Sequence, residues 1–366
     1  MDRKRMEQTK MLAEFFACFV CVPDGKWEEA YQKVIEMIAR MERETKENKK
    51  LKLIKTAKEL EYAEREELNL ALLTVEEGGV LNGNRNRLEE LYQRGVRLIT
   101  LTWNYENCIG YPNSRNAQEM QKGLKSFGKQ MVEEMNERGM LVDVSHLSDG
   151  GFWDCIRLSK KPIIASHSNA RALCAHPRNL SDEMLCALGE CGGVVGLNFY
   201  PQFLQSDRSA EVLDIAKHGM HILQKAGEDS VALGTDFDGF EAGQNWLRGI
   251  EEIECVWDAL KKAGMTERQL DKLSYQNVKR VLEEVHLNIS QNKVWLSAGE
   301  SGTIGKIETT KEKDREDFSM ENQKIIQVEE KVPFKMLLPL SIQHMFAMFG
   351  ASVLVPFVFG INPAVV

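Results

Sequence analysis

Residues 140–167, MLVDVSHLSDGGFWDCIRLSKKPIIASH, decide the fold class of this chain because they contain a strand, a helix and a second strand in succession. The runs Met140–Ser145 and Pro162–Ser166 are almost wholly apolar, which suits strands buried on both faces. A strand, a helix and a further strand in this order form a parallel pair with a right-handed crossover. Each of the two strands is followed by a histidine, His146 and His167.

The same alternation of apolar runs and amphipathic stretches extends over residues 1–287. The other strand candidates are Phe15–Val22, Leu70–Val75, Arg97–Trp103, Val194–Phe199 and Val231–Thr235. Helices are predicted at Gln118–Arg138, at Asp182–Cys191 behind a Ser181 cap, and from Thr266 to about Glu284. Seven strands are visible, whereas a closed (β/α)₈ barrel needs eight. We therefore expect an α/β, TIM-like barrel that lacks one strand.

Composition sets the broad class of the protein. The chain has 366 residues, 47 of them basic and 55 acidic, for a formal net charge of −8, and 43% are hydrophobic. This balance is typical of a soluble globular protein and excludes a collagen, a disordered chain or a polytopic membrane protein as a whole. The acidic excess argues against a nucleic-acid partner. Glu14 interrupts the first apolar run and no small-residue cleavage site follows, so we expect no signal peptide and a cytoplasmic protein.

Several cysteines and histidines are predicted to carry no chemistry. The eight cysteines are scattered through apolar runs, as free buried thiols in a reducing compartment are. Cys18 and Cys21 have CxxC spacing, but in a strand these positions point to opposite faces, so we expect two core thiols and no zinc site. His218 and His221 stand three apart on a predicted helix and are expected on the surface.

The character of the chain changes after Leu287. Residues 288–319 are polar and are predicted to be a linker. Met336–Gly360 is 25 residues without a charge, long enough to cross a bilayer as a C-terminal hydrophobic helix and to make contact with a membrane. Pro339 and Pro356 would kink such a helix, and the alternative is a soluble or disordered tail.

Polar residues follow four of the predicted strands. Glu76 and Glu77 end one run, His146 and His167 end two more, and Asp236 ends another. In a parallel barrel the groups that react gather at these carboxyl ends. Imidazoles and carboxylates suit zinc, which makes bound water a nucleophile near neutral pH. The sequence therefore predicts a zinc site at the mouth of the barrel.

Four motifs in combination resemble the membrane (renal) dipeptidase family of zinc metallopeptidases, over residues 1–287. They are Thr74-Val-Glu-Glu-Gly-Gly79, Gly139-Met-Leu-Val-Asp-Val-Ser-His146, Ser166-His167-Ser-Asn-Ala170 with His176-Pro-Arg178-Asn179, and Asp236-Phe-Asp238-Gly239. The resemblance implies a (β/α)₈ barrel of the amidohydrolase type that holds two zinc ions. It also implies hydrolysis of dipeptides, often with a D-residue at the C-terminal position.

Metal ligands can be carried over from this resemblance. Glu76 would be the catalytic glutamate that bridges the metals, with Glu77 as the alternative because two acids precede Gly-Gly. His146 and His167 would ligate the second zinc.

Substrate contacts can be carried over in the same way. Arg178, with Asn179 of the same motif, would bind the substrate, the arginine holding its carboxylate as a bidentate partner. Asp236 would take the proton of the attacking water and hold the substrate amine.

The chain departs from the family pattern at two places. The first strand of the family ends in a His-x-Asp pair that binds the other zinc, and no histidine precedes His146 here. We therefore expect a sequence that starts after this first strand, with one zinc site and reduced turnover. Some members have a substrate-contacting histidine where this chain has Trp103.

The tail has a resemblance of its own, because residues 320–366 are similar to the start of a xanthine/uracil-type permease. Three functions follow as hypotheses. The first is a zinc dipeptidase whose activity is impaired by loss of the His-x-Asp ligands. The second is a non-catalytic barrel whose open seam associates with a second copy, forming a homodimer. The third is a membrane-associated permease fragment, although one hydrophobic segment cannot form a transport path.

Overall fold

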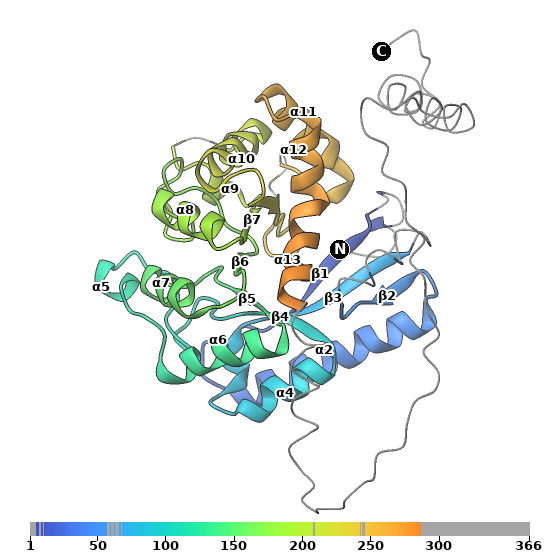
Figure 1. Cartoon of the computed structure of the whole chain (residues 1–366), viewed down its shortest axis with the longest axis vertical. Helices are drawn as coiled ribbons and strands as arrows, with labels where there is room; N and C mark the ends of the chain where they lie inside the picture. Colours follow the sequence, from blue (N-terminus) through green and yellow to red (C-terminus); the bar gives the residue numbers. More distant parts are fainter. Residues whose placement is uncertain are drawn as a thin grey trace, which may run out of the picture. The chain divides into compact units, whose positions relative to one another are not determined.

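A computed structural model describes residues 5, 6, 9, 11–56, 59, 62, 66, 68–207, 209–241, 243 and 246–286 of the chain. Its centre is a parallel sheet whose strands lie side by side in the order β1-β3-β4-β5-β6-β7-β8, with β2 paired to β3 (Figure 1). The strands are β1 (Ala13–Phe19), β2 (Leu51–Leu53), β3 (Asn69–Glu76), β4 (Val96–Thr100), β5 (Leu141–Asp143), β6 (Ile164–Ala165), β7 (Val194–Leu197) and β8 (Val231–Leu233).

All seven predicted strands are present, and the predicted α/β barrel-type fold is confirmed in open form. Among the described residues β1 pairs with β3 alone and β8 pairs with β7 alone, so the sheet is a curled half-barrel (Figure 1). The sequence did not predict β2, a three-residue strand that lies parallel to the start of β3.

Helices follow most strands, as expected for right-handed crossovers. They are α2 (Trp27–Glu47), α4 (Arg85–Gln93), α5 (Ala117–Met120), α6 (Ser126–Arg138), α7 (Asp149–Leu158), α8 (Asp182–Glu190), α9 (Pro201–Leu204), α10 (Val212–Ala226), α11 (Ile253–Lys262), α12 (Glu267–Asp271) and α13 (Asn277–His286). Most of them pack on one face of the sheet, where strand residues such as Leu73, Val75 and Val142 join the main core.

The other face of the sheet carries the groups of chemical interest. At the amino ends of the strands it is apolar, because Leu70, Leu98 and Ile164 form a second core with Val281 and Val285 of α13. Alternation along each strand keeps the same face for every second residue. Glu76, Thr100, Asp143, Ser166 and Asp236 therefore follow on this face towards the carboxyl ends of β3, β4, β5, β6 and β8.

The prediction of one continuous helix over Gln118–Arg138 is wrong, because the helix is interrupted between α5 and α6. A Cβ atom on Gly123 would lie 2.3 Å from Oδ2 of Asp154, so any other residue there would displace this carboxylate. The backbone N–H of Leu124 donates to the same carboxylate at 2.7 Å. By contrast, Ser181 caps α8 as predicted, and the capping box of Thr266 and Gln269 opens α12.

Two predictions about individual side chains are wrong. Cys18 is buried, but Cys21 is exposed, because β1 ends at Phe19 and leaves Cys21 in the following loop. Cys255 on α11 is exposed as well, so the eight thiols are not all buried as predicted. His218 is buried in α10 and is not a surface residue. Its Nδ1 accepts a hydrogen bond from the backbone N–H of Ala170 at 3.1 Å, and its Nε2 lies 3.0 Å from the carbonyl oxygen of Leu204.

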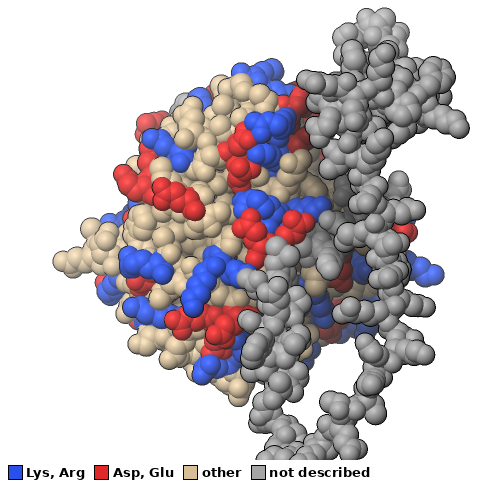
Figure 2. Space-filling model, in the orientation of Figure 1, with Lys and Arg blue, Asp and Glu red and all other residues tan. Residues whose placement is uncertain are grey.

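The predicted linker at 288–319, the hydrophobic segment Met336–Gly360 and the permease-like region 320–366 lie outside the described residues. Within the described part of the chain, no helix has both the length and the apolar character that crossing a membrane requires. On the face of the molecule shown in Figure 2, basic and acidic side chains are interspersed.

Candidate metal centre

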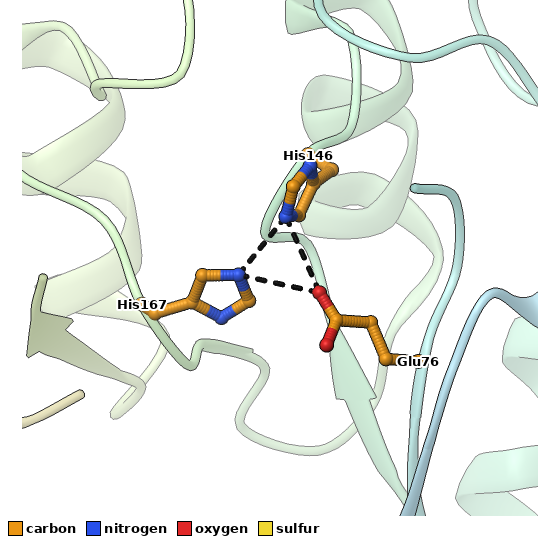
Figure 3. Close-up of side chains that lie close together, drawn as sticks. All are labelled: Glu76, His146 and His167. Atoms are coloured by element: carbon orange, nitrogen blue, oxygen red, sulfur yellow. Dashed lines mark hydrogen bonds and ion pairs between the residues drawn. The ribbon is translucent and has the colours of Figure 1, made fainter. Parts of the chain in front are cut away.

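Three predicted ligands meet at the carboxyl ends of the strands. Glu76 is the last residue of β3, His146 follows β5, and His167 follows β6. Their ligand atoms lie within 4.8 Å of one another, with both histidines buried and Glu76 partly buried. Oε1 of Glu76 is 3.3 Å from Nε2 of His146 and 3.5 Å from Nε2 of His167 (Figure 3). The two Nε2 atoms are 3.0 Å apart.

These distances fit a shared metal ion. Zinc bonds of ~2.0–2.1 Å in a tetrahedral arrangement separate neighbouring ligand atoms by roughly 3.4 Å. The observed separations of 3.0, 3.3 and 3.5 Å lie around this value. Two imidazole nitrogens and one carboxylate oxygen also match the ligand set of catalytic zinc sites, which keep a further position open. The three residues therefore fit a zinc ion.

The backbone at the strand ends is turned sharply to direct these side chains. Four described residues other than glycine have a left-handed backbone, and three of them belong to the predicted site: Glu77 (φ 106°), His146 (φ 66°) and Asp236 (φ 59°). Such conformations cost of order 1–3 kcal/mol each and are concentrated at functional sites.

Glu77 is directed away from the histidines. It is fully buried, and its carboxylate accepts hydrogen bonds from the backbone N–H of Gly79 at 2.8 Å, from Nδ2 of Asn107 at 2.6 Å and from the backbone N–H of Trp103 at 3.2 Å. Burial raises the pKa of both Glu76 and Glu77, and the charge of His167 opposes the rise at Glu76. Of the two acids, the structure brings only Glu76 to the histidines.

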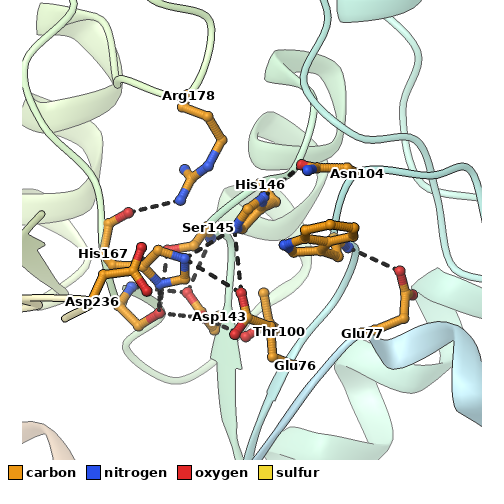
Figure 4. A network of polar contacts seen from close by, with 12 residues as sticks. Glu76, Glu77, Thr100, Asn104, Asp143, Ser145, His146, His167, Arg178 and Asp236 are labelled. Carbon is orange, nitrogen blue, oxygen red and sulfur yellow. Dashed lines mark hydrogen bonds and ion pairs between the residues drawn. The ribbon is translucent and has the colours of Figure 1, made fainter. Parts of the chain in front are cut away.

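His146 is held in a form that can bind a metal. Burial, followed by the positive charge of Arg178 and the proximity of His167, lowers the pKa of His146 well below its usual value of 6.5. The imidazole is therefore neutral near pH 7. Its Nδ1 lies 3.0 Å from Oδ1 of Asn104, an acceptor that places the ring proton on Nδ1 and leaves the lone pair on Nε2 (Figure 4).

Arg178 lies directly behind His167. One Nη donates to the carbonyl oxygen of His167 at 2.9 Å, and the other lies 3.3 Å from Oγ of Ser168. Among the described residues, none accepts a hydrogen bond from the buried Nε. Burial lowers the pKa of Arg178 to about 10, so the guanidinium is still a cation at neutral pH. A buried cation with a donor to spare is suited to an anionic group.

Asn179 and Asp236 occupy different environments. The side-chain amide of Asn179 is fully buried and donates to the carbonyl oxygens of Cys174 and Phe203 at 2.9 and 2.8 Å. It fixes the loop that carries Arg178, and its contact with substrate stays a prediction. Asp236 is partly exposed and accepts a hydrogen bond from Nδ2 of Asn198 at 3.1 Å. Figure 4 shows its carboxylate beside the imidazole of His167.

A second layer of polar residues around the histidines was not predicted as part of the site. The hydroxyls of Thr100 and Ser166 donate to Asp143, and Oγ of Ser166 also contacts His167. Figure 4 shows Thr100 and Asp143 beneath His167. All three are polar residues on the same face of the sheet as Glu76. Alternation along the strands, counted from the apolar residues at the amino ends, could have identified them.

Two glycines allow the backbone of Ser166 to pack closely against the neighbouring strands. A Cβ atom on Gly196 of β7, or on Gly234 just after β8, would lie 2.0 Å from the carbonyl oxygen of Ser166. The carbonyl oxygen of Ser166 therefore packs closely against the backbone at the carboxyl ends of β7 and β8, two strands that provide none of the three predicted ligands.

Comparisons with known proteins identify the family and relatives of this chain. Residues 1–294 match the membrane dipeptidase family, peptidase family M19. An uncharacterised dipeptidase of Schizosaccharomyces pombe is 32% identical over 320 residues, which are 83% of this chain and 77% of that protein. The dipeptidase tcpJ of Claviceps purpurea is 29% identical over 305 residues, or 78% and 69% of the two chains.

Solved structures share the fold. The dipeptidase AC, a metallopeptidase of family M19, has a TM-score of 0.71 at 26% identity, covering 78% of this chain and 89% of its own. A metallopeptidase of Rhodobacter sphaeroides, solved with a phosphinate mimic of the dipeptide L-Ala-D-Ala, has a TM-score of 0.70 at 25% identity, covering 78% and 90%.

Proposed function

The chain belongs to the membrane dipeptidase family, peptidase family M19, and from this premise we propose that it hydrolyses dipeptides with zinc held by Glu76, His146 and His167. Members of this family are metallopeptidases, and this chain is a hydrolase of that class. The observation that carries the choice of site is the convergence of two imidazoles and one carboxylate within 4.8 Å at the mouth of the half-barrel.

A zinc ion at this position would act as a Lewis acid towards the peptide carbonyl and lower the pKa of water. The protein residues then bind and orient the substrate. Arg178 binds the terminal carboxylate through its guanidinium, which is buried and therefore poorly screened by solvent. Asp236 accepts the proton of the attacking water and passes it to the leaving amine, as a general acid and base does. Asn198 holds the carboxylate of Asp236 in place for this transfer.

The substrate class is a free dipeptide. Arg178 is in direct contact with His167, because its guanidinium donates a hydrogen bond to the carbonyl oxygen of His167 at 2.9 Å. A carboxylate bound there would stand close to the metal, which leaves room for about one residue between the scissile bond and the chain terminus. We include substrates with a C-terminal D-residue, in keeping with the L-Ala-D-Ala mimic bound to the Rhodobacter sphaeroides relative.

We propose one zinc site in this chain. The described residues hold one group of three or more histidine, cysteine, aspartate or glutamate side chains whose ligand atoms converge. No histidine precedes His146 in the sequence. With a single ion, turnover should be well below that of relatives with two.

The test combines metal content with activity of the full chain. Elemental analysis after dialysis should give up to one zinc per chain, and the zinc-loaded protein should release alanine from L-Ala-L-Ala and L-Ala-D-Ala. Two tightly bound zinc ions per chain would contradict the single site. A folded protein that binds zinc but cleaves neither dipeptide would contradict the peptidase assignment.

One observation favours a second candidate function, self-association without catalysis. Within the described residues the outer edge of β1 has no strand partner, and Phe19 at its end is 39% exposed. An edge strand of this kind is a template for pairing with another chain. Light scattering of the full chain across a range of concentrations tests this candidate, since a monomer at all concentrations would exclude it.

A further inference from the structure

The buried carboxylate of Asp143 organises the layer beneath the metal ligands. It is 0% exposed and accepts four hydrogen bonds. The backbone N–H groups of Ser145 and Ser166 donate to Oδ1 at 3.0 and 2.9 Å. The hydroxyls of Thr100 and Ser166 both donate to Oδ2 at 2.6 Å. Both hydroxyls are the donors in these bonds, so both hydroxyl protons point towards Asp143.

Ser166 makes a second short contact that decides where the proton of His167 lies. Its Oγ is 2.7 Å from Nδ1 of His167. A serine hydroxyl has one proton, and Ser166 already donates that proton to Asp143. Towards His167 it can therefore act only as an acceptor, so the ring must carry its proton on Nδ1. The lone pair of the neutral imidazole is then on Nε2, the atom that faces Glu76 and His146.

The surrounding contacts hold this arrangement rigidly. The backbone N–H of His167 donates to Oγ of Ser145 at 3.1 Å, and its carbonyl oxygen accepts from Arg178 at 2.9 Å. The carbonyl oxygen of Ser166 packs against Gly196 and Gly234. The backbone on both sides of His167 is thus held in place, which fixes the position from which the imidazole extends towards Ser166.

We propose that Ser166, oriented by Asp143, is a positioning residue that fixes His167 in the Nδ1–H tautomer and keeps Nε2 bare for a metal ion. In the opposite tautomer the proton would lie on the nitrogen that must bind the ion. The consequence for metal affinity rests on the proposed function, whereas the tautomer itself can be measured on metal-free protein. Thr100 provides a built-in comparison, because it bonds the same carboxylate oxygen at the same distance but has no contact with a ligand histidine.

The experiment reads the tautomer directly. Metal-free protein labelled with ¹⁵N-histidine is examined by long-range ¹H–¹⁵N correlation near pH 7.5, and the His167 signals are assigned by their loss in His167→Gln. In the wild type, Nδ1 of His167 should show a pyrrole-type shift and Nε2 a pyridine-type shift. Ser166→Ala should move the ring towards the Nε2–H form and weaken zinc binding about 10- to 100-fold in competition titrations.

Two further variants separate positioning from general packing. Asp143→Asn replaces Oδ2 by a donor, so Ser166 would accept from the amide and donate to His167, which reverses the tautomer. Thr100→Val removes a hydroxyl from the same carboxylate and should leave both the tautomer and the zinc dissociation constant within about threefold of the wild type. Circular dichroism and thermal unfolding establish that each variant is folded.

The outcomes are distinct. A wild-type His167 with its proton on Nε2 overturns the proposal without any variant, and so does a folded Ser166→Ala that keeps the wild-type tautomer. Equal changes in Ser166→Ala and Thr100→Val would show a packing role and also overturn it. If Ser166→Ala fails to fold, the wild-type spectrum and Asp143→Asn decide. A wild type that has the predicted tautomer but binds no zinc would refute the proposed function and leave the positioning role supported.

Discussion

The Nε2 atoms of His146 and His167 lie 3.0 Å apart, although the two residues stand 21 positions apart and follow different strands. Each ring turns its Nδ1 to a separate oxygen, Asn104 Oδ1 for His146 and Ser166 Oγ for His167. With both ring protons on Nδ1, two lone pairs face each other across this distance and repel. A cation between them converts the repulsion into binding, which is why the pair indicates a metal centre more strongly than either histidine alone.

Glu76 and Glu77 form a matched pair of variants. Glu76→Gln should abolish tight zinc binding, because it replaces the carboxylate that lies 3.3 and 3.5 Å from the two imidazole nitrogens. Glu77→Gln should keep zinc but lower the free energy of unfolding by about 1–3 kcal/mol, since its three buried hydrogen bonds are disturbed. Zinc titration and urea unfolding measure the two effects. If Glu77→Gln lost zinc and Glu76→Gln kept it, the ligand would be Glu77 and the prediction for Glu76 would be wrong.

The histidines can be tested against another histidine of the same chain. His146→Gln and His167→Gln should each weaken zinc binding by at least 10²-fold, because a site with three protein ligands loses one of them. His221 pairs with Asp182 at 2.7 Å on α10 and α8 and has no contact with the site. His221→Gln should therefore bind zinc as the wild type does. Equilibrium dialysis with ⁶⁵Zn measures all three, and an equal loss in His221→Gln would point to unfolding instead.

Arg178→Lys should raise KM for L-Ala-L-Ala by roughly 10- to 100-fold, because a lysine cannot reproduce the planar, bidentate contact with a carboxylate. The control is a second substrate, L-Ala-L-Ala amide, which lacks the terminal carboxylate. If Arg178 binds that group, the wild type should lose a similar factor on the amide, and Arg178→Lys should lose little more. A variant that loses the same factor on both substrates would exclude this role.

Asp236→Asn should lower kcat by about 10²- to 10⁴-fold, the range expected when a general acid–base group is removed. The amide can keep its hydrogen bond to Asn198, so the fold and zinc content should stay as in the wild type. Steady-state kinetics and elemental analysis check the two parts. Activity within threefold of the wild type would show that another group transfers the proton.

The buried His218 predicts a dependence of stability on pH. Burial lowers the pKa of His218 to about 4, and the hydrogen bond to the carbonyl oxygen of Leu204 opposes this shift only in part. The unfolded chain takes up this proton below about pH 6.5, whereas the folded protein does not. The free energy of unfolding should thus fall by up to about 3 kcal/mol as the pH drops from 6.5 to 4. Urea unfolding at several pH values measures the slope, which should become shallower in His218→Gln.

The main features of the fold could be predicted because they repeat along the chain. Buried parallel strands are continuous apolar runs, and all seven such runs became strands. β2 has only three residues, Leu51–Leu53, too few to show a pattern. The break at Gly123 depends on Asp154, 31 residues later in the sequence, so the local periodicity of Gln118–Arg138 could not reveal it.

The site could be predicted as far as strand ends determine it. Glu76, His146 and His167 come together because the carboxyl ends of neighbouring parallel strands meet. The choice between Glu76 and Glu77 needs the backbone, since a left-handed turn at Glu77 directs that side chain to Asn107. The burial of His218 was missed because residues from distant parts of the chain, Ala170 and Leu204 at the end of α9, enclose it.

The candidate metal centre also depends on Gly196 and Gly234, two residues at strands that provide none of the three predicted ligands. Each is closed to a methyl group by the carbonyl oxygen of Ser166. An alanine at either position would displace the peptide that precedes His167, so a change of one carbon atom on β7 or after β8 should disturb a ligand it never touches. Variation in this enzyme is therefore restricted by the space around the ligands as well as by their chemistry.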